Sequence, residues 1–295
     1  MAKAKGAFTN LDKIFWPKEG YTKGDVIEYY DRVADYILPH LRARPMVLNR
    51  TPEGIKGFSF FQKNVNPSTL PPFVKTFPLR AESTGKMVNY VVCDNKETLL
   101  YLANLGCIEM HPWNSRSENI HAPDFLAIDL DPGKRDFDDV ISVARSLKSI
   151  IESAGGKSVV KTSGKTGIHI YVPLAGKYEF PEVRAVAKEI VLKANRELPE
   201  LTTLERHPSK RRGKIYLDYL RNGLGQTLAA AYSLRAYPGA NVSAPLEWSE
   251  VKKGLRPEQF TIKTIFRRLN SKGDLWKSLA KQKNNLKEIS KKLGR

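Results

Sequence analysis

The feature that most constrains this chain is the order of its hydrophobic patterns between residues 125 and 222. Short runs rich in β-branched residues alternate with longer stretches in which apolar residues recur at helical spacing. The predicted segments are, in order, a strand at 125–131, a helix around 140–151, strands at 159–163 and 168–174, a helix opened by Pro181, and a strand at 214–222. The order is therefore β-α-β-β-α-β.

That order matches a ferredoxin-like split unit, which RNA-recognition sheets also use and in which the first strand lies between the third and the fourth. The residues before it predict a mixed unit, with a helix over Thr22–Leu38, extended segments at 45–50, 57–63 and 87–94, and a short helix over Glu97–Leu105. The fold class is thus α/β (α+β), a β-α-β-β-α-β sheet packed on an N-terminal mixed α/β unit.

We expect one domain over 1–295 with three parts: an N-terminal α/β subdomain (1–122), a core that carries the sheet (123–236) and a C-terminal basic region (237–295). From Ser271 the tail holds eight basic and two acidic residues. A weak apolar stripe runs through it at Leu275, Leu279, Leu286, Ile289 and Leu293. This pattern predicts a solvated helix that docks loosely on the body.

Charge narrows the class of partner. The chain has 49 Lys and Arg against 31 Asp and Glu, a net charge of +18, so a polyanion is the expected partner. No apolar run is long enough to span a bilayer, and the opening residues lack the apolar segment of a signal peptide. Cys93 and Cys107 form no C-x-x-C pair, which argues against a structural zinc site. We expect a cytoplasmic nucleic-acid binder with no membrane partner.

The first candidate site residues are Asp129 and Asp131, which lie two positions apart on a predicted strand. Their carboxylates therefore project from one face of the sheet. At a separation of about 5 Å two unit charges repel by about 3 kcal/mol at an effective dielectric near 20, and a divalent cation relieves this repulsion. The motif alone is weak, because a turn at the end of the strand also explains Asp131 before Pro132.

Asp218 strengthens the metal hypothesis. It is a lone carboxylate in the apolar and aromatic strand YLDYL, where an unpaired charge is costly. In the split topology its strand borders the first one, so Asp218 can approach Asp129 and Asp131. Three acids on adjacent strands are typical of a two-metal phosphoryl-transfer site. The alternative is a salt bridge from Asp218 to Lys214 or Arg221.

Two segments supply candidate phosphate contacts. SGKTGIH at 163–169 joins the second and third strands, and Ser163, Lys165 and His169 provide donors beside flexible glycines. It is no Walker loop, and a hairpin with a solvated lysine is the alternative. RHPSKRRGK at 206–214 precedes the Asp218 strand, where it can grip template or triphosphate, although such blocks are usually solvated loops.

Two further features concern DNA. Of the consecutive aromatics Phe60 and Phe61, one faces outward on a strand and can stack on a base, although both can equally belong to the core. At the N-terminus, Thr22 is expected to cap a helix that starts with Lys23, so free amides and an ammonium group favour an anion there. A loop can bring Lys13 and Asn10 to the same place. The alternative is ordinary surface lysines.

In this order the motifs resemble the archaeo-eukaryotic primase superfamily, specifically the polymerase domain of bacterial ligase D and its stand-alone relatives in non-homologous end joining. The resemblance covers nearly the whole chain. The segments that carry it are FTNLDKIFWPKEGYTKGD at 8–25, HPWNSR at 111–116, DLDP at 129–132, SGKTGIH at 163–169, YLDYLRN at 216–222 and QTLAAAYSLRA at 226–236.

The resemblance implies an archaeo-eukaryotic primase-like fold and a role for each matching residue. Asp129, Asp131 and Asp218 would bind two catalytic Mn²⁺ or Mg²⁺ ions. The remaining implied roles are nucleotide binding by His111, Ser163, Lys165, His169, Thr227 and Arg235, template contact by Phe60, Phe61 and Arg211, and binding of a 5′-phosphate on the downstream strand by Asn10, Lys13 and Lys23.

We therefore predict an enzyme, a nucleotidyltransferase of the primase-polymerase type that fills or extends DNA ends and gaps. The resemblance implies a preference for ribonucleoside triphosphates, 5′-phosphorylated DNA as substrate, a nucleoid-associated place in the prokaryotic cytosol, and Ku and a separate DNA ligase as partners. A non-catalytic module that binds DNA ends and a metal-dependent nuclease are the alternatives. The presence of all three acids argues against the first, and the triphosphate-facing set Ser163, His169 and Arg235 argues against the second.

Overall fold

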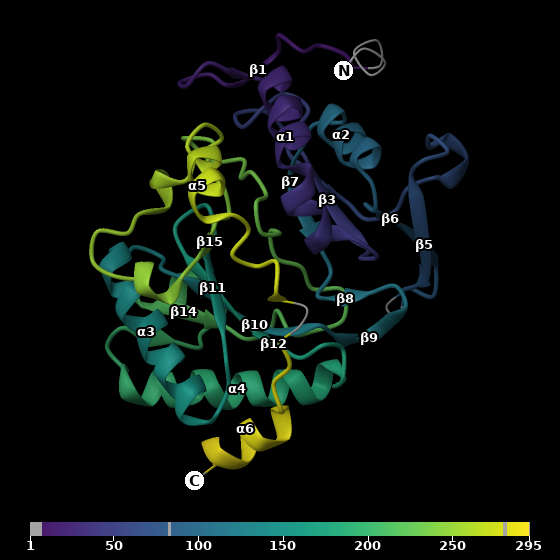
Figure 1. Ribbon diagram of the computed structural model, residues 1–295. Helices are drawn as coiled ribbons and strands as arrows, with labels where there is room; N and C mark the ends of the chain where they lie inside the picture. The colour runs from purple at the N-terminus through teal and green to yellow at the C-terminus, as the bar shows by residue number, and fades with distance from the viewer. Residues whose placement is uncertain (1–7, 82–83, 280–281, 295) are drawn as a thin grey trace.

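A six-stranded sheet forms the centre of the molecule (Figure 1). The structure, a computed structural model, describes residues 8–81, 84–279 and 282–294. The sheet has the order β13-β14-β10-β12-β11-β15. Its strands are β10 (Phe125–Asp131), β11 (Val159–Thr162), β12 (Ile168–Pro173), β13 (Thr202–Thr203), β14 (Ile215–Asp218) and β15 (Pro245–Leu246).

The predicted split β-α-β-β-α-β order is confirmed. Strand β10 lies between β12 and β14 and is antiparallel to both. The connecting helices α3 (Phe137–Ser153) and α4 (Phe180–Glu197) cover one face of the sheet (Figure 1). Because Ile128 and Leu130 are fully buried while Asp129 and Asp131 are partly exposed, the two acids lie on the other face, as the period of a strand requires.

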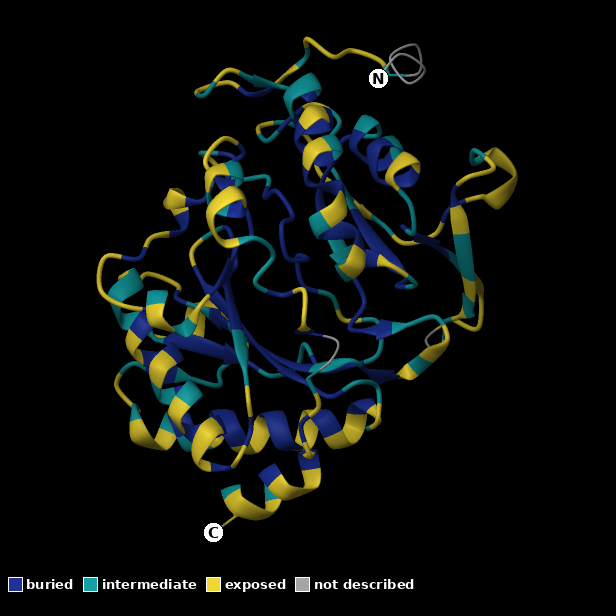
Figure 2. Ribbon diagram, viewed as in Figure 1, coloured by how far each residue is buried: buried dark blue, intermediate teal, exposed yellow. Residues whose placement is uncertain are grey.

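The N-terminal part is a mixed α/β unit, as predicted. Helix α1 (Lys23–Leu41) buries one stripe and exposes the opposite one (Figure 2). It extends beyond the predicted end at Leu38, because Pro39 lies in its last turn, where little of the helix remains to be disrupted. The other elements of this unit are β1 (Ile14–Trp16), β2 (Tyr21–Thr22), β3 (Met46–Arg50), β4 (Phe60–Gln62), β5 (Lys75–Arg80), β6 (Met87–Val92), α2 (Lys96–Asn104), β7 (Cys107–Pro112), β8 (Ser115–Arg116) and β9 (Asn119–Pro123).

Strand β7 was not predicted, although it is central to this unit. It pairs with β3, which in turn pairs with β4. Five of its six residues are buried, so its side chains do not alternate between apolar and polar in the way that marks a half-exposed strand. A short strand buried on both faces gives no periodic signal of its own.

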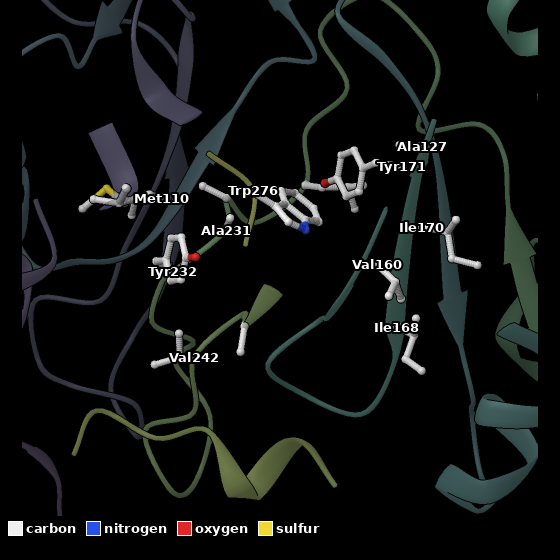
Figure 3. Packing of buried hydrophobic residues seen from close by; sticks show 14 of the residues in the cluster. Met110, Ala127, Val160, Ile168, Ile170, Tyr171, Ala231, Tyr232, Val242 and Trp276 are labelled. Atoms are coloured by element: carbon white, nitrogen blue, oxygen red, sulfur yellow. The ribbon is translucent and has the colours of Figure 1, made fainter. Parts of the chain in front are cut away.

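The C-terminal part is bound to the core more closely than the sequence suggested. Its helices are α5 (Ile265–Lys272) and α6 (Leu286–Leu293). Trp276 is buried, and the buried Asn284 donates to the carbonyls of Lys157 and Pro173 while it accepts from the Lys157 amide. The prediction of a loosely docked helix was therefore wrong, since Trp276 packs in the core against Tyr171 (Figure 3) and Asn284 ties this segment to the end of β12 and to the loop before β11. No helix in the described ranges is both long and apolar enough to cross a membrane.

Candidate active site

The register of the sheet brings together two of the three predicted catalytic acids and one predicted nucleotide contact. Asp129 on β10 lies directly opposite Asp218 on β14 and directly opposite His169 on β12. His169 Nε2 is 3.3 Å from Asp129 Oδ1. Residues that are 89 positions apart in the sequence are therefore cross-strand neighbours, because β10 is the central strand of the split unit.

A single guanidinium group joins Asp129 and Asp218. Arg221 Nε lies 3.0 Å from Asp218 Oδ2 and 3.5 Å from Asp129 Oδ2. The predicted alternative of a salt bridge from Asp218 to Arg221 is thus also present, whereas Lys214 donates to the carbonyl of Pro199 instead. One positive group therefore lies between the two carboxylates.

Asp131 is turned away from the other two acids. Its carboxylate is about half exposed and accepts from Arg211 Nη1 at 2.6 Å. Among the described residues no three acidic, histidine or cysteine side chains are gathered closely enough to hold an ion as they stand. The physical reason is repulsion: with protein charges alone, each carboxylate pairs with the nearest arginine rather than with another carboxylate.

The electrostatics of the acid pair nevertheless fit a divalent cation. Burial raises the pKa of Asp218 above its ordinary value, and Asp129 raises it further against the effect of Arg221. Burial also acts to raise the pKa of Asp129, but His169 and Arg221 outweigh it and hold that pKa well below the ordinary range. Asp218 is therefore the acid whose charge its protein partners do not fully balance, and carboxylate oxygens are the ligands that hard cations prefer.

His169, the cross-strand neighbour of Asp129 on β12, is held by a buried lysine that was not predicted from the sequence. Lys161 Nζ lies 2.7 Å from His169 Nδ1 and also donates to the Ser243 hydroxyl. Burial, and after it the proximity of Lys161, lower the pKa of His169 to about 3. The imidazole is therefore neutral, and a proton on Nε2 faces Asp129, since Nδ1 accepts from Lys161.

A second cluster surrounds Glu109 on β7, a residue that sequence reasoning missed. Its Oε1 lies 3.1 Å from Lys165 Nζ and 3.2 Å from Arg235 Nε, and its Oε2 lies 2.7 Å from His111 Nε2. The carboxylate is 2% exposed. Burial acts to raise the pKa of Glu109, but Arg235, His111 and Lys165 outweigh it and hold that pKa far below the ordinary range.

The Glu109 cluster collects three of the predicted nucleotide contacts at one point. It lies beside the loop of Ser163, whose carbonyl accepts from Arg235 and whose hydroxyl accepts from the amides of Lys165 and Gly167. Gly167 is required here, because a Cβ at this position would lie 2.1 Å from the carbonyl oxygen of Leu130. Thr227 pairs with Trp113 in an isolated β-bridge next to the same region.

The residues predicted to contact the template, Phe60, Phe61 and Arg211, do not form one cluster. Phe61 is 68% exposed and Phe60 is half-buried, with Phe58 stacked on Phe60 at 5.8 Å between ring centroids. The alternative that both Phe60 and Phe61 belong to the core is therefore wrong. Arg211 does not join them, because its side chain contacts Asp131 and lies over the ring of Tyr216.

The N-terminal lysines do converge, but the helix start differs from the expectation. Lys23 Nζ donates to the carbonyl of Thr9, and the proximity of Lys13, after burial, lowers the pKa of Lys23. Asn10 adopts a left-handed backbone, φ 55°, in the loop between them. Lys13 also pairs with Glu53.

The expectation of free amides in the first turn of α1 was wrong. The Lys23 and Gly24 amides donate to the carbonyls of Lys13 and Leu11, and the Asp25 amide donates to Thr22. The N-terminal loop folds back onto the helix and takes the donors that an anion would otherwise use. Any anion site here therefore depends on the two ammonium groups.

Sequence reasoning missed Glu109, Lys161 and the bridging role of Arg221. Glu109 had a usable signal, since it is a lone carboxylate in the apolar run CIEMHP, the same pattern that singled out Asp218. Lys161 had a similar one within VVKTS. Neither signal says which partner the charge has, because the partners come from distant strands.

Comparison with known proteins supports the resemblance to the polymerase domain of ligase D. The family described as "LigD, primase-polymerase domain" matches residues 22–276. The chain is 38% identical over 269 residues to the bifunctional non-homologous end joining protein LigD of Bacillus subtilis. It is 31% identical over 270 residues to the multifunctional non-homologous end joining protein LigD of Pseudomonas aeruginosa.

These two alignments cover 90% and 91% of this chain but 43% and 32% of the relatives, so the chain spans less than half of their length. A solved structure described as the polymerase domain from Mycobacterium tuberculosis ligase D in complex with DNA matches with a TM-score of 0.85 at 28% identity. That match covers 94% of this chain and 98% of the solved one, so the two chains share one fold over nearly their full lengths.

The family match covers most of the chain, the relatives align over nine-tenths of it, and the solved polymerase domain shares its fold. The chain therefore belongs to the LigD primase-polymerase domain family, whose members are nucleotidyltransferases with an archaeo-eukaryotic primase-like fold.

Proposed function

We propose that this chain extends and fills DNA ends and gaps in non-homologous end joining by template-directed nucleotidyl transfer. One observation carries the proposal: Asp129 faces Asp218 on one neighbouring strand and His169 on the other. Carboxylates for cations and donors for a triphosphate therefore meet at one strand. We also propose a division into 1–122, which carries the 5′-phosphate site with Phe60 and Phe61, 123–236, which carries the three acids, and 237–295, which packs on the core.

Asp129, Asp131 and Asp218 are the residues that would hold two divalent ions, manganese or magnesium. Such ions supply Lewis-acid activation of the attacking hydroxyl and neutralise charge on the triphosphate. The chain's own part is to keep the acids in register. Arg211 and Arg221 hold these carboxylates in the absence of cations, and both guanidinium groups become free for phosphate oxygens when the acids take other partners.

Ser163, Lys165, His169, Thr227 and Arg235 form the proposed triphosphate site. Because the imidazole of His169 is neutral, its Nε2 acts as a hydrogen-bond donor rather than as a charge. The two full charges come from Lys165 and Arg235, which the shared Glu109 keeps beside each other. Like charges this close would repel without the carboxylate.

His111 is the proposed contact of the nucleotide sugar, and it underlies the proposed preference for ribonucleotides. Its ring is 12% exposed and is held by Glu109, so its position is fixed relative to Lys165 and Arg235. Phe60, Phe61 and Arg211 are the proposed template contacts, and Asn10, Lys13 and Lys23 the proposed 5′-phosphate site. Ku and a separate ligase are the proposed partners.

A gap-filling assay tests the function. The protein is incubated with gapped, 5′-phosphorylated DNA, Mn²⁺ and labelled ribonucleoside or deoxyribonucleoside triphosphates, and product length is measured. We expect templated extension, faster with ribonucleotides. Shortened primers would indicate a nuclease, and DNA binding without any change in length would indicate a non-catalytic end-binding module. Either result would overturn the proposal.

A further inference from the structure

An arginine-lined cavity lies next to Asp218, on the side of the site that the predicted nucleotide contacts leave open. Its volume is about 400 Å³. The lining side chains that matter here are Arg184, Arg206, Arg211 and Arg221, with Asp218 as the single carboxylate. Four guanidinium groups against one carboxylate make a strongly anion-selective space.

Two of these arginines have no acidic partner in the described part of the chain. Arg211 and Arg221 pair with Asp131, Asp129 and Asp218, as described above. Arg184 donates through Nε to the carbonyl of Asn222, and the exposed Arg206 makes no side-chain ion pair. Guanidinium groups without a carboxylate are available for phosphate oxygens, which they bind through two parallel hydrogen bonds.

The cavity continues into a second hollow of about 650 Å³, with which it shares Arg184 and Leu220. This hollow follows the first turns of α4 and is lined by Phe180, Tyr219, Leu224 and Lys188. Glu179 also lines it and contributes a carboxylate beside Lys188 and Arg184, while its amide donates to Glu182. A track that begins with arginines and continues with aromatic and apolar side chains suits a single strand, which needs cations for phosphates and flat surfaces for bases and sugars.

The order of strands assigns a direction to this track. Ser163, Lys165 and Arg235 belong with the β11 and β12 side of β10, whereas Asp218 and the arginine cavity belong with the β14 side. In phosphoryl transfer the attacking and the leaving oxygens lie roughly in line on opposite sides of phosphorus. If the pyrophosphate leaves on the β12 side, the attacking hydroxyl arrives from the β14 side.

We propose that the cavity and the hollow bind the primer strand, with Arg184 and Arg206 on the phosphodiester groups next to its 3′-hydroxyl and the α4 surface under the nucleotides behind it. This inference rests on the proposed function and deepens it, because it names the residues that hold the attacking strand. It separates them from the residues proposed for the triphosphate, the template and the 5′-phosphate.

Binding in EDTA tests the proposal without catalysis. Fluorescence anisotropy compares a labelled template with and without an annealed primer that leaves a recessed 3′ end, with the 5′-phosphorylated downstream strand in both. For the wild type we expect tighter binding of the primed DNA. The variant Arg184→Ala/Arg206→Ala should lose about ten-fold or more in affinity for primed DNA and little for unprimed DNA, with a shallower salt dependence.

Three controls make the result specific. Arg196→Ala removes the same charge from an exposed position near the other end of α4 and should change neither affinity. Arg184→Lys keeps the charge and should restore part of the loss if phosphate binding, rather than the contact with Asn222, is responsible. Thermal melting reports any folding defect. The apparent KM for nucleotide should stay within about two-fold in the double variant.

An equal loss for primed and unprimed DNA, or no loss at all, would overturn the primer assignment. So would a rise in nucleotide KM without a change in DNA affinity, because the arginines would then belong to the triphosphate. These outcomes are distinct from failure of the proposed function. If the wild type never extends DNA but binds the primed form more tightly through Arg184 and Arg206, the proposed activity fails and the strand site stands.

Discussion

Two buried carboxylate groups in this molecule are built in opposite ways. Glu109 is surrounded by Lys165, Arg235 and His111, so the protein itself supplies more positive charge than the carboxylate needs. Asp218 faces a second acid, Asp129, and the two share one guanidinium group. The cations around Glu109 lower its pKa against the effect of burial. Burial raises the pKa of Asp218, and the nearby Asp129 raises it further.

The difference separates a carboxylate that positions other groups from one that awaits a ligand. A buried charge with complete protein partners holds those partners in place and loses stability when it is removed. A buried charge with too few partners lowers the stability of the free protein. A bound ion that supplies the missing opposite charge restores that stability. Glu109 is of the first kind, and Asp218 is of the second, whereas His169 and Arg221 hold the pKa of Asp129 well below its ordinary range.

The largest expected effect tests the acid pair. Asp129→Asn or Asp218→Asn should reduce extension by about 10³-fold or more, because each substitution removes a charge from the cation site while the basic surface remains. Extension in Mn²⁺ is measured by gel, and DNA affinity by anisotropy should stay near the wild-type value. Near wild-type extension by either variant would remove the metal assignment.

The same variants give a readout besides activity. In EDTA, Asp218→Asn should melt at or above the wild-type temperature, because it ends the repulsion with Asp129 while Oδ1 can still accept from Leu220. Added Mn²⁺ should then raise the melting temperature of the wild type and not that of the variant. If Asp218→Asn melts well below the wild type in EDTA, Asp218 is a structural carboxylate like Glu109.

The second effect concerns Glu109. Glu109→Gln leaves Lys165 and Arg235 without their buried counter-charge, and we expect a loss of about 3 kcal/mol in unfolding free energy. Nucleotide affinity should fall about ten-fold, since the cations are no longer held. Chemical denaturation measures the first and nucleotide titration the second. Glu152→Gln, which breaks an exposed helix pair with Lys148, is the matched control and should cost under about 1 kcal/mol.

The Glu109 effect has a definite pH dependence. Because its pKa is lower in the folded protein than the ordinary value of 4.5, the folded state keeps the ionised form more strongly than the unfolded state does. This stabilisation is complete above about pH 4.5 and is lost as the pH falls toward the folded pKa. The stability gap between wild type and Glu109→Gln should therefore narrow below pH 4.5. A gap that is constant from pH 6 to pH 3 would mean that packing, and not charge, explains it.

A smaller effect tests the donors that face the triphosphate. His169→Ala or Arg235→Ala should weaken nucleotide binding about ten-fold and DNA binding by much less, since both are assigned to the nucleotide. Nucleotide and DNA titrations are run beside thermal melting. Equal losses for the two ligands, with a lower melting temperature, would show that these residues maintain the fold of the site instead.

The smallest effect belongs to the N-terminal lysines. A terminal phosphate carries more charge than an internal one, so gapped DNA with a 5′-phosphate should bind about five-fold tighter than the hydroxyl form at moderate salt. Lys13→Ala/Lys23→Ala should erase that difference, whereas Lys18→Ala/Lys56→Ala, two exposed lysines of the same subdomain, should retain it. Equal binding of both DNA forms by the wild type would show that the pocket is misassigned.

The structure of the core could be predicted from the sequence because its signals are local. Alternation placed Asp129 and Asp131 on one face of β10, and the order of strands and helices implied that β14 would border it. The same reasoning failed for β7, where continuous burial removes the alternation of apolar and polar residues. It also failed for the tail, where Asn284 binds Pro173 on β12 and Lys157 in the loop before β11, contacts that no local pattern reveals.

By itself, the sequence determined which residue types stand on which strand, and through that the element order, the acid pair and the loop at 163–169. Tertiary structure decided how the charges are paired: Arg221 between Asp129 and Asp218, Arg211 on Asp131, and three cations around Glu109. It also decided that the first amides of α1 donate to the N-terminal loop. The reason is physical, because strand and helix periods act over a few residues, whereas ion pairs and hydrogen bonds form between whichever groups the packed chain brings within about 3 Å.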